Sequence, residues 1–304
     1  MPVRSTNPIG YLVTFCSAFL FSTESILAKI CYKFGFNIYD LVTMRFLIAA
    51  LFFVVLAKVV KSKLLPYKDQ WKQILPIIAT QIIAIFCLYR AFDLLPPAVA
   101  VLFFNAYPAL TGLFDKILCK NILGKQRIIA LIISAVGLLM LYWGSFASVN
   151  VVGMLLALGA ALSNAFSFVL MGIYLPKVDH ITYNCTMFFT CILIFGATGL
   201  LTEGLPTEIS AKGWLFVIIF GVLTAGAYYT FTYSVVAVGA VDSAIIYLVE
   251  PLLAAVWAFW FLGDKLLPLQ ALGGLLIIAA AAIPPVWAKI MLNKSVKEHL
   301  GGIE

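Results

Sequence analysis

Long runs of apolar residues follow one another along almost the whole chain, separated by short polar connections. A helix needs roughly 20 mostly apolar residues to cross the hydrocarbon core of a bilayer. Ten runs approach or exceed that length, and they predict helices over residues 9–31, 38–60, 73–94, 98–118, 126–143, 152–175, 182–201, 214–238, 243–262 and 269–287. With 63% hydrophobic and 11% charged residues in 304, the pattern predicts an all-α integral membrane protein with ten transmembrane helices.

The ten predicted helices form two sets of five that are related by a shift of 143 positions. Without any gap, the shift pairs identical residues: Gly10 with Gly153, Thr43-Met44 with Thr186-Met187, Trp71 with Trp214, and Pro108 with Pro251. An odd number of helices per repeat makes the second repeat enter the membrane from the opposite side, as in many secondary transporters. We therefore predict two inverted five-helix repeats, at residues 9–143 and 152–287, and a short basic cytoplasmic tail at 288–304.

Lysine and arginine residues are distributed unevenly between the two predicted sides of the membrane. If the N-terminus is cytoplasmic, fourteen of them fall on the cytoplasmic side and four on the other, namely Lys29, Lys33, Lys212 and Lys265. Positively charged loops stay in the cytoplasm, so we expect a multi-pass protein of the cytoplasmic membrane with both termini inside. The net charge of +7 then reflects topology, and the basic residues at 58–72 are expected to face lipid and not nucleic acid.

Few residues in the sequence are suited to metal or redox chemistry. The six cysteines show no C-x-x-C spacing, and the two histidines, His180 and His299, lie at the edge of a predicted helix and in the tail. The phosphate-binding pattern G-x-x-x-x-G-K-[ST] is absent, so ATP is not expected to be the direct energy source. We expect no metal, no cofactor and no enzymatic activity.

Glu250 is the most informative charged residue in the predicted helices. It lies about eight residues into its helix, or roughly 12 Å at 1.5 Å per residue, where a charge costs at least ~2.5 to 3.5 kcal/mol. Pro251 follows it and is expected to loosen the helix and free carbonyl groups. Ser243, Tyr247, Glu250 and Trp257 are spaced to share one helical face. Glu250 therefore either binds substrate or a coupling proton, or is a structural residue at a packing point.

The equivalent helix of the first repeat contains Asn105, Tyr107 and Pro108, and the shift places Tyr107 opposite Glu250. Proline-interrupted helices at matching positions of two repeats are the best sequence indication of a transporter site. We therefore expect Asn105, Tyr107 and Tyr247 to line that site, and Pro108 and Pro251 to shape it.

Other polar residues in the predicted helices leave two interpretations open. Glu24 lies within Ser22-Thr23-Glu24-Ser25, and Lys29 or Arg45 could neutralise it, so it is either part of a structural ion pair or a substrate contact. Arg90 and Asp93, three residues apart, favour a structural pair. Asn164 either lines the cavity or forms a hydrogen bond between helices.

Aromatic residues recur on helices that we expect to face the centre of the bundle. Tyr89, Tyr229 and Tyr233 are the candidates for substrate contact, and the last two share a helical face at i and i+4. Taken singly, each is also compatible with packing or with contact to lipid.

Short motifs in both repeats resemble those of the drug/metabolite transporter superfamily, in its EamA-like branch of ten-helix proteins. The matching residues are Ser22, Lys29 and Arg45 of Met44-Arg45-Phe46 in the first repeat, and Glu250-Pro251-Leu252-Leu253, Gly263-Asp264, Gln270 and Gly273 in the second. The chain departs from the family pattern at Phe21, Glu24 and Lys120-Asn121. The resemblance implies a central cavity between helices one, three, four, six, eight and nine, and transport of amino acids, nucleobases or similar metabolites, often outward.

Together these features predict a secondary transporter that moves a small organic metabolite across the membrane by alternating access, with export as the expected direction. Protons are the hypothetical coupling ion. The alternatives are a passive facilitator of the same solutes or an integral-membrane enzyme, which would need a nucleophile or metal cluster at a membrane face.

Overall fold

The computed structural model describes residues 7–143, 150–202, 209–263 and 267–300, which form helices and turns without any strand. Asp264 of the Gly263-Asp264 motif lies outside these ranges, as does Lys265, one of the four basic residues predicted on the non-cytoplasmic side. The helices are α1 (Pro8–Lys33), α2 (Ile38–Val60), α3 (Trp71–Leu94), α4 (Pro97–Phe104), α5 (Tyr107–Cys119), α6 (Lys125–Leu141), α7 (Val151–Tyr174), η1 (Leu175–Lys177), α8 (His180–Thr202), α9 (Ala211–Val238), α10 (Ala240–Tyr247), α11 (Val249–Leu262) and α12 (Pro268–Leu300).

Nine helical spans within the described ranges are long and apolar enough to cross a membrane, with α4–α5 and α10–α11 each forming one of them. The remaining predicted helix, α6, has 17 residues and packs along α12. The all-α membrane fold is thus confirmed, and every predicted apolar run is helical, two of them with a break.

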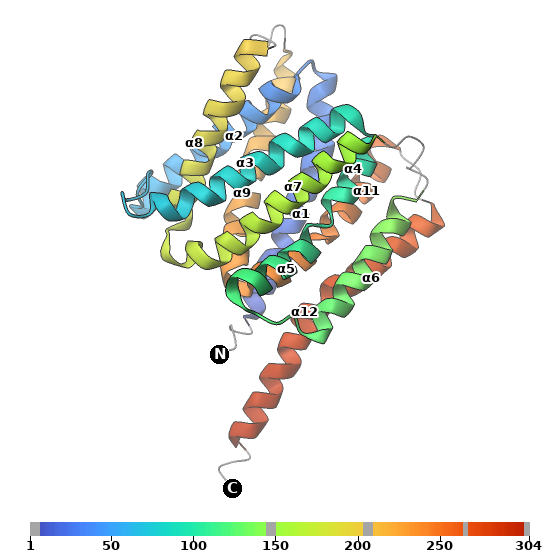
Figure 1. The fold of residues 1–304 in the computed structure, drawn as a ribbon. Helices are drawn as coiled ribbons and strands as arrows, with labels where there is room; N and C mark the ends of the chain where they lie inside the picture. Colours follow the sequence, from blue (N-terminus) through green and yellow to red (C-terminus); the bar gives the residue numbers. More distant parts are fainter. Residues whose placement is uncertain (1–6, 144–149, 203–208, 264–266, 301–304) are drawn as a thin grey trace.

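The last helix differs most from its prediction. It was expected to end at Trp287, but α12 continues to Leu300 and passes through Pro284 and Pro285. Figure 1 shows its C-terminal part projecting beyond the rest of the bundle, on the same side as the N-terminus. The end was misplaced because the apolar run stops there, whereas helical backbone can continue outside a membrane.

The helices pack in pairs drawn from both halves of the chain (Figure 1): α1 lies along α9, α3 along α7, α2 along α8 and α9, and α6 along α12. The shift of 143 residues relates α1 to α7 and α3 to α9, so the α1–α9 pair corresponds to the α3–α7 pair. It also aligns helix starts, since 8 + 143 = 151 and 125 + 143 = 268. The two halves therefore have the same order of helices and related packing.

Small residues allow α6 and α12 to approach closely. A Cβ added at Gly137 would lie 2.7 Å from the carbonyl oxygen of Gly273, and one added at Gly273 would lie 2.5 Å from that of Gly137. Backbone contact of this kind is typical of membrane helices, where packing replaces the hydrophobic effect.

Candidate functional site

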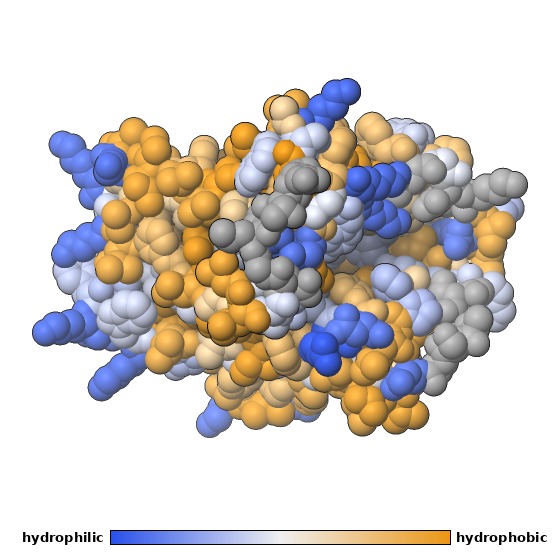
Figure 2. Space-filling view, turned by 90° about the horizontal axis from the view of Figure 1, so that it is seen from above, coloured by the Kyte–Doolittle hydropathy of each residue, from blue (hydrophilic) through white to orange (hydrophobic). Residues whose placement is uncertain are grey.

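A cavity of about 860 Å³ lies between the helices of the two halves. Its walls come from α1, α2, α3, α4, α7, α9, α10 and α11, together with Tyr107 at the start of α5 and Tyr142 beside the end of α6. The lining residues of α1 belong to its C-terminal half and those of α2 to its N-terminal half. The cavity therefore occupies the end of the bundle opposite the chain termini, and Figure 2 looks onto that hollowed end.

Two broken helices meet at this cavity. The span that begins with α4 breaks at Asn105 and Ala106, and the span that begins with α10 breaks at Leu248. The breaks are in register, because 105 + 143 = 248. Pro108 and Pro251 lie in the first turns of the second half-helices. A proline is tolerated there because first-turn N–H groups form no hydrogen bond within the helix. The predicted interruptions near the prolines are thus present, and each proline lies one or two residues after the start of a half-helix.

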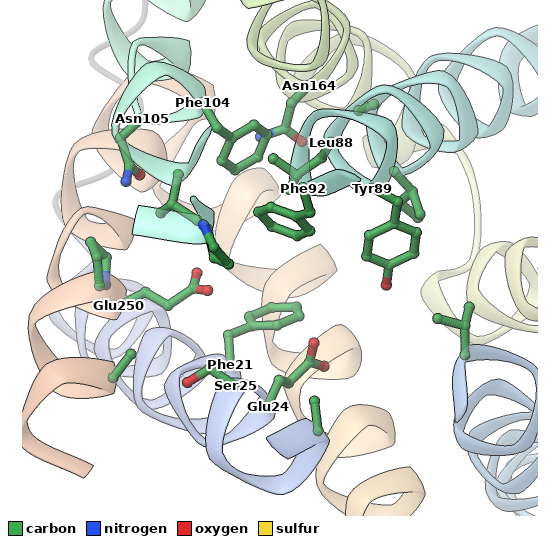
Figure 3. A pocket seen from close by; sticks show the side chains of 18 of the residues that line it. Phe21, Glu24, Ser25, Leu88, Tyr89, Phe92, Phe104, Asn105, Asn164 and Glu250 are labelled. Atoms are coloured by element: carbon green, nitrogen blue, oxygen red, sulfur yellow. The ribbon is translucent and has the colours of Figure 1, made fainter. Parts of the chain in front are cut away.

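Glu250 lies in the first turn of α11 and points into the cavity (Figure 3). A carboxylate is favoured there by the helix dipole. In the described part of the chain, it has no hydrogen-bond or ion-pair partner. The site therefore presents a free carboxylate to whatever fills the cavity.

The expected single face of Ser243, Tyr247, Glu250 and Trp257 does not form, because the break at Leu248 separates the first two residues from the last two. Tyr247 and Glu250 line the cavity, while Ser243 is fully buried. Trp257 instead donates a hydrogen bond of 2.9 Å from Nε1 to Ser22 Oγ, joining α11 to α1.

Glu24 is neutralised by Arg45 on the cavity wall. Arg45 Nη1 lies 2.6 Å from Glu24 Oε2, and Thr224 donates a 3.2 Å hydrogen bond to the other carboxylate oxygen. The guanidinium carbon of Arg45 is 4.7 Å and 5.2 Å from the ring centroids of Phe46 and Phe220. Of the two cations that the sequence offered, Arg45 makes the ion pair, while Lys29 lines the cavity without a salt bridge among the described residues.

Aromatic rings form the inner floor of the cavity. Phe168 lies 5.4 Å from Tyr107 and 5.2 Å from Phe231, and Phe231 lies 5.4 Å from Tyr247, between ring centroids. The hydroxyl of Tyr247 shares a 3.3 Å hydrogen bond with Ser234 Oγ. These edge-to-face and tilted contacts make a packed surface that suits an apolar or ring-bearing solute.

Asn105, Asn164 and Tyr89 also line the cavity, as expected (Figure 3). The amide nitrogen of Asn105 is buried without a hydrogen-bond partner among the described residues. Asn164 belongs to the cavity wall, which was one of its two predicted positions.

Tyr229 and Tyr233 do not line the cavity, and the expectation that they would face it is wrong. Their relative exposures are 44% and 36%, and their rings lie near Phe53 and His180. Tyr228 lines the cavity instead. Neighbouring residues of a helix point about 100° apart, so the spacing of the tyrosines identified their shared face but not its direction.

Several lining aromatics were missed by the sequence analysis, namely Phe21, Tyr142, Tyr228 and Phe231. In a chain with 24 phenylalanines and 13 tyrosines, a single aromatic residue gives little positional information. The i and i+3 spacing of Tyr228 and Phe231 was the available signal.

Arg90 and Asp93 form the predicted pair, with Nη1 and Oδ2 2.8 Å apart. Both side chains are more than half exposed, and such pairs contribute about 0 to 1 kcal/mol. Asp93 reaches the cavity mouth, whereas Arg90 does not line the cavity.

Metal ligands do not cluster in the described ranges, where no group of three or more His, Cys, Asp or Glu side chains could hold an ion. No disulfide joins the six cysteines, all of which lie in the described ranges. His180 begins α8, away from the cavity-lining residues, and the side chain of His299 lies outside the described part of the structure.

Comparisons with known proteins agree with this architecture. The model of the EamA-like transporter family matches residues 8–143 and again residues 151–283. A solved structure titled "Crystal structure of protein" aligns with a TM-score of 0.80 at 19% identity, covering 92% of this chain and 98% of that chain. This likeness concerns the fold. No curated protein matches the chain.

Proposed function

Because the chain belongs to the EamA-like transporter family of membrane transporters, we propose that it is a secondary carrier of a small organic solute. The solute is an amino acid, a nucleobase or a metabolite of similar size, and transport proceeds by alternating access across the cytoplasmic membrane. Export is the proposed direction.

The observation that carries this proposal is the free carboxylate of Glu250 at a helix break inside the cavity. Broken helices expose backbone polar groups, which is tolerated in a membrane only where they line a cavity or are buried in protein. An unpaired acid at that point needs a task, since a buried charge without a partner is costly. We assign it to recognition of the solute or of a coupling proton.

The wall around Glu250 supports recognition of an organic molecule. Tyr107 and Tyr247 lie beside the two helix breaks, and the buried amide nitrogen of Asn105 has no hydrogen-bond partner among the described residues. Aromatic faces and a few placed polar groups are typical of small-molecule sites. Asn105, Asn164, Tyr89, Tyr107 and Tyr247 are therefore proposed as solute contacts beside Glu250.

Alternating access would follow from an inverted arrangement of the two repeats. The support is the shared register of helix starts and of helix breaks at a shift of 143 residues. In such folds, one set of helices rocks against the other around a fixed site near the membrane midplane. With the N-terminus in the cytoplasm, as the distribution of lysine and arginine favours, the cavity of this structure would open to the outside.

The test is counterflow in proteoliposomes. Vesicles preloaded with unlabelled solute are given labelled amino acids, nucleobases or simple organic acids, one class at a time, with and without a pH gradient. Saturable uptake that is stimulated by internal solute identifies a carrier, and stimulation by the gradient identifies proton coupling.

A saturable response that ignores the pH gradient would identify a passive facilitator, in which Glu250 only orients solute. No uptake across the panel, with protein shown to be folded and monodisperse, would contradict transport of these solute classes.

A further inference from the structure

Three side chains from distant parts of the sequence meet below the cavity, near the chain termini. Arg127 Nε lies 2.6 Å from Asp242 Oδ1, Arg127 Nη2 donates a 3.1 Å hydrogen bond to Asp242 Oδ2, and the Tyr11 hydroxyl donates a 3.2 Å hydrogen bond to Oδ2. These residues belong to the first turns of α6, α10 and α1. Together, the three contacts tie three helices to one carboxylate.

This cluster lies at the closed end of the cavity. Asp242 lies in the first turn of the same short helix that ends with Tyr247 in the cavity floor. Ser243, Ala244, Ile245 and Ile246, the residues between them, are fully buried. The helix α10 is therefore the plug that separates the cavity from the terminal end, and Asp242 fixes its outer end.

A single glycine connects this plug to the helix before it. Gly239 is the only residue between α9 and α10, and its φ of 94° and ψ of 160° lie in a region that other residues rarely adopt. The start of α10 is therefore held by this short link, by the packing of Val241 and Ile245 against Ala130 of α6, and by the contacts of Asp242.

The positions related to this pair by the repeat carry no ion pair at the opposite end of the bundle. The shift of 143 relates Arg127 to Gln270 and Asp242 to Val99 (127 + 143 = 270; 242 − 143 = 99). Gln270 accepts a 3.0 Å hydrogen bond from Leu267 N at the start of its own helix, and Val99 is buried among apolar side chains. The two repeats thus differ at these related positions, because one has an arginine–aspartate ion pair and the other does not.

We propose that Arg127, Asp242 and Tyr11 form a latch that keeps the terminal end closed and biases the carrier toward the conformation described here. The latch rests on the alternating-access mechanism proposed above. Opening the terminal end requires Arg127 to leave Asp242, whereas the related positions at the opposite end, Gln270 and Val99, hold no charge pair. The bidentate arginine makes this bond directional, since its planar fork matches a carboxylate.

Site-specific cysteine labelling tests the latch without knowledge of the solute. Ser243→Cys places a thiol of similar size in the buried plug, and Ala254→Cys places one on the cavity wall. Each is reacted with a water-soluble maleimide in purified full-length protein, and labelling is read by peptide mass spectrometry so that the six native cysteines stay in place.

With the latch intact, we expect Ser243→Cys to be protected and Ala254→Cys to react. Arg127→Gln, which installs the residue of the related position, should speed labelling of Ser243→Cys roughly tenfold and slow that of Ala254→Cys by a similar factor. Tyr11→Phe removes one hydrogen bond and should move both rates in the same directions by a few-fold. The matched control is Arg90→Gln, which breaks an exposed arginine–aspartate pair and should change neither rate.

The reciprocal change separates a latch from a structural staple. Simple loosening of the fold would raise labelling at both positions, and unchanged rates in folded Arg127→Gln and Tyr11→Phe protein would equally overturn the latch. If Arg127→Gln does not fold, the two labelling rates in Tyr11→Phe protein decide whether the latch exists. Saturable counterflow by such variants would support the carrier proposal even if the latch proposal fails. Absent counterflow in wild-type protein would contradict the carrier proposal, and the labelling rates would still show whether Arg127 and Tyr11 hold the terminal end closed.

Discussion

Arg45 Nη1 lies 2.6 Å from Glu24 Oε2 across the cavity wall, between helices whose side chains at these positions are 9% and 20% exposed. The unusual acid of the first helix is thus balanced by the arginine that opens the second. Glu24 and Arg45 cancel each other's charge, so Glu250 is the acidic side chain of the cavity that has no ion-pair partner among the described residues.

Removing only one member of the Glu24–Arg45 pair should destabilise the protein. Glu24→Gln leaves the guanidinium of Arg45 buried without its counter-charge, and such losses cost about 3 kcal/mol or more. The free energy of unfolding, measured by detergent titration of purified protein, is expected to fall by about that amount.

Removing both charges of the Glu24–Arg45 pair provides the comparison for the single variant. The double variant Glu24→Gln and Arg45→Met leaves no buried charge, and we expect its unfolding free energy to exceed that of the single variant. Equal losses in the two variants would argue against a buried ion pair.

The helices were largely predictable, because an apolar run of fixed length leaves few alternatives in a membrane. The α2 boundaries, Ile38–Val60, were predicted to the residue. The breaks near Pro108 and Pro251 followed from proline chemistry and from the repeat, although the break at Leu248 precedes the expected position by a residue or two.

Some side-chain partners were predictable, since Arg45 was one of two cations proposed for Glu24, 21 residues away. Arg90 and Asp93 were paired from their spacing, whereas Arg127 and Asp242 are 115 residues apart and were not singled out. Tyr229 was chosen over Tyr228 because periodicity defines a face without saying which way it points. Long-range partners and absolute helix rotation come from packing, which a single sequence does not display.

Gly239 should resist substitution although it is far from Glu250 in sequence. Its positive φ with extended ψ is strained for any residue with a Cβ, so Gly239→Ala should cost about 1 to 3 kcal/mol. The control is Gly159→Ala, inside α7, where an added Cβ meets no atom within 4 Å. That change should be neutral or stabilise the helix by up to about 1 kcal/mol. A tolerated Gly239→Ala would mean that α10 can join α9 in another way.

Tyrosines on the two sides of the bundle should differ in their effect on transport. Tyr247→Phe removes the hydroxyl that holds this cavity-floor ring against the buried Ser234 and should raise the KM for the solute about tenfold, as expected when one hydrogen bond that positions the wall is lost. Tyr229→Phe changes an exposed side chain and should leave counterflow kinetics unchanged. The opposite ranking would place the solute on the outer face.

The proposed transport function depends most on the unpaired carboxyl group of Glu250, and counterflow by Glu250→Gln tests this role most directly. The matched control is Asp115→Asn, which neutralises a carboxylate that bonds Asn121 and does not line the cavity. We expect Glu250→Gln to lose saturable exchange, or to lose its response to a pH gradient, while Asp115→Asn keeps both. Wild-type rates and wild-type pH dependence in folded Glu250→Gln protein would contradict the proposed role of this carboxylate.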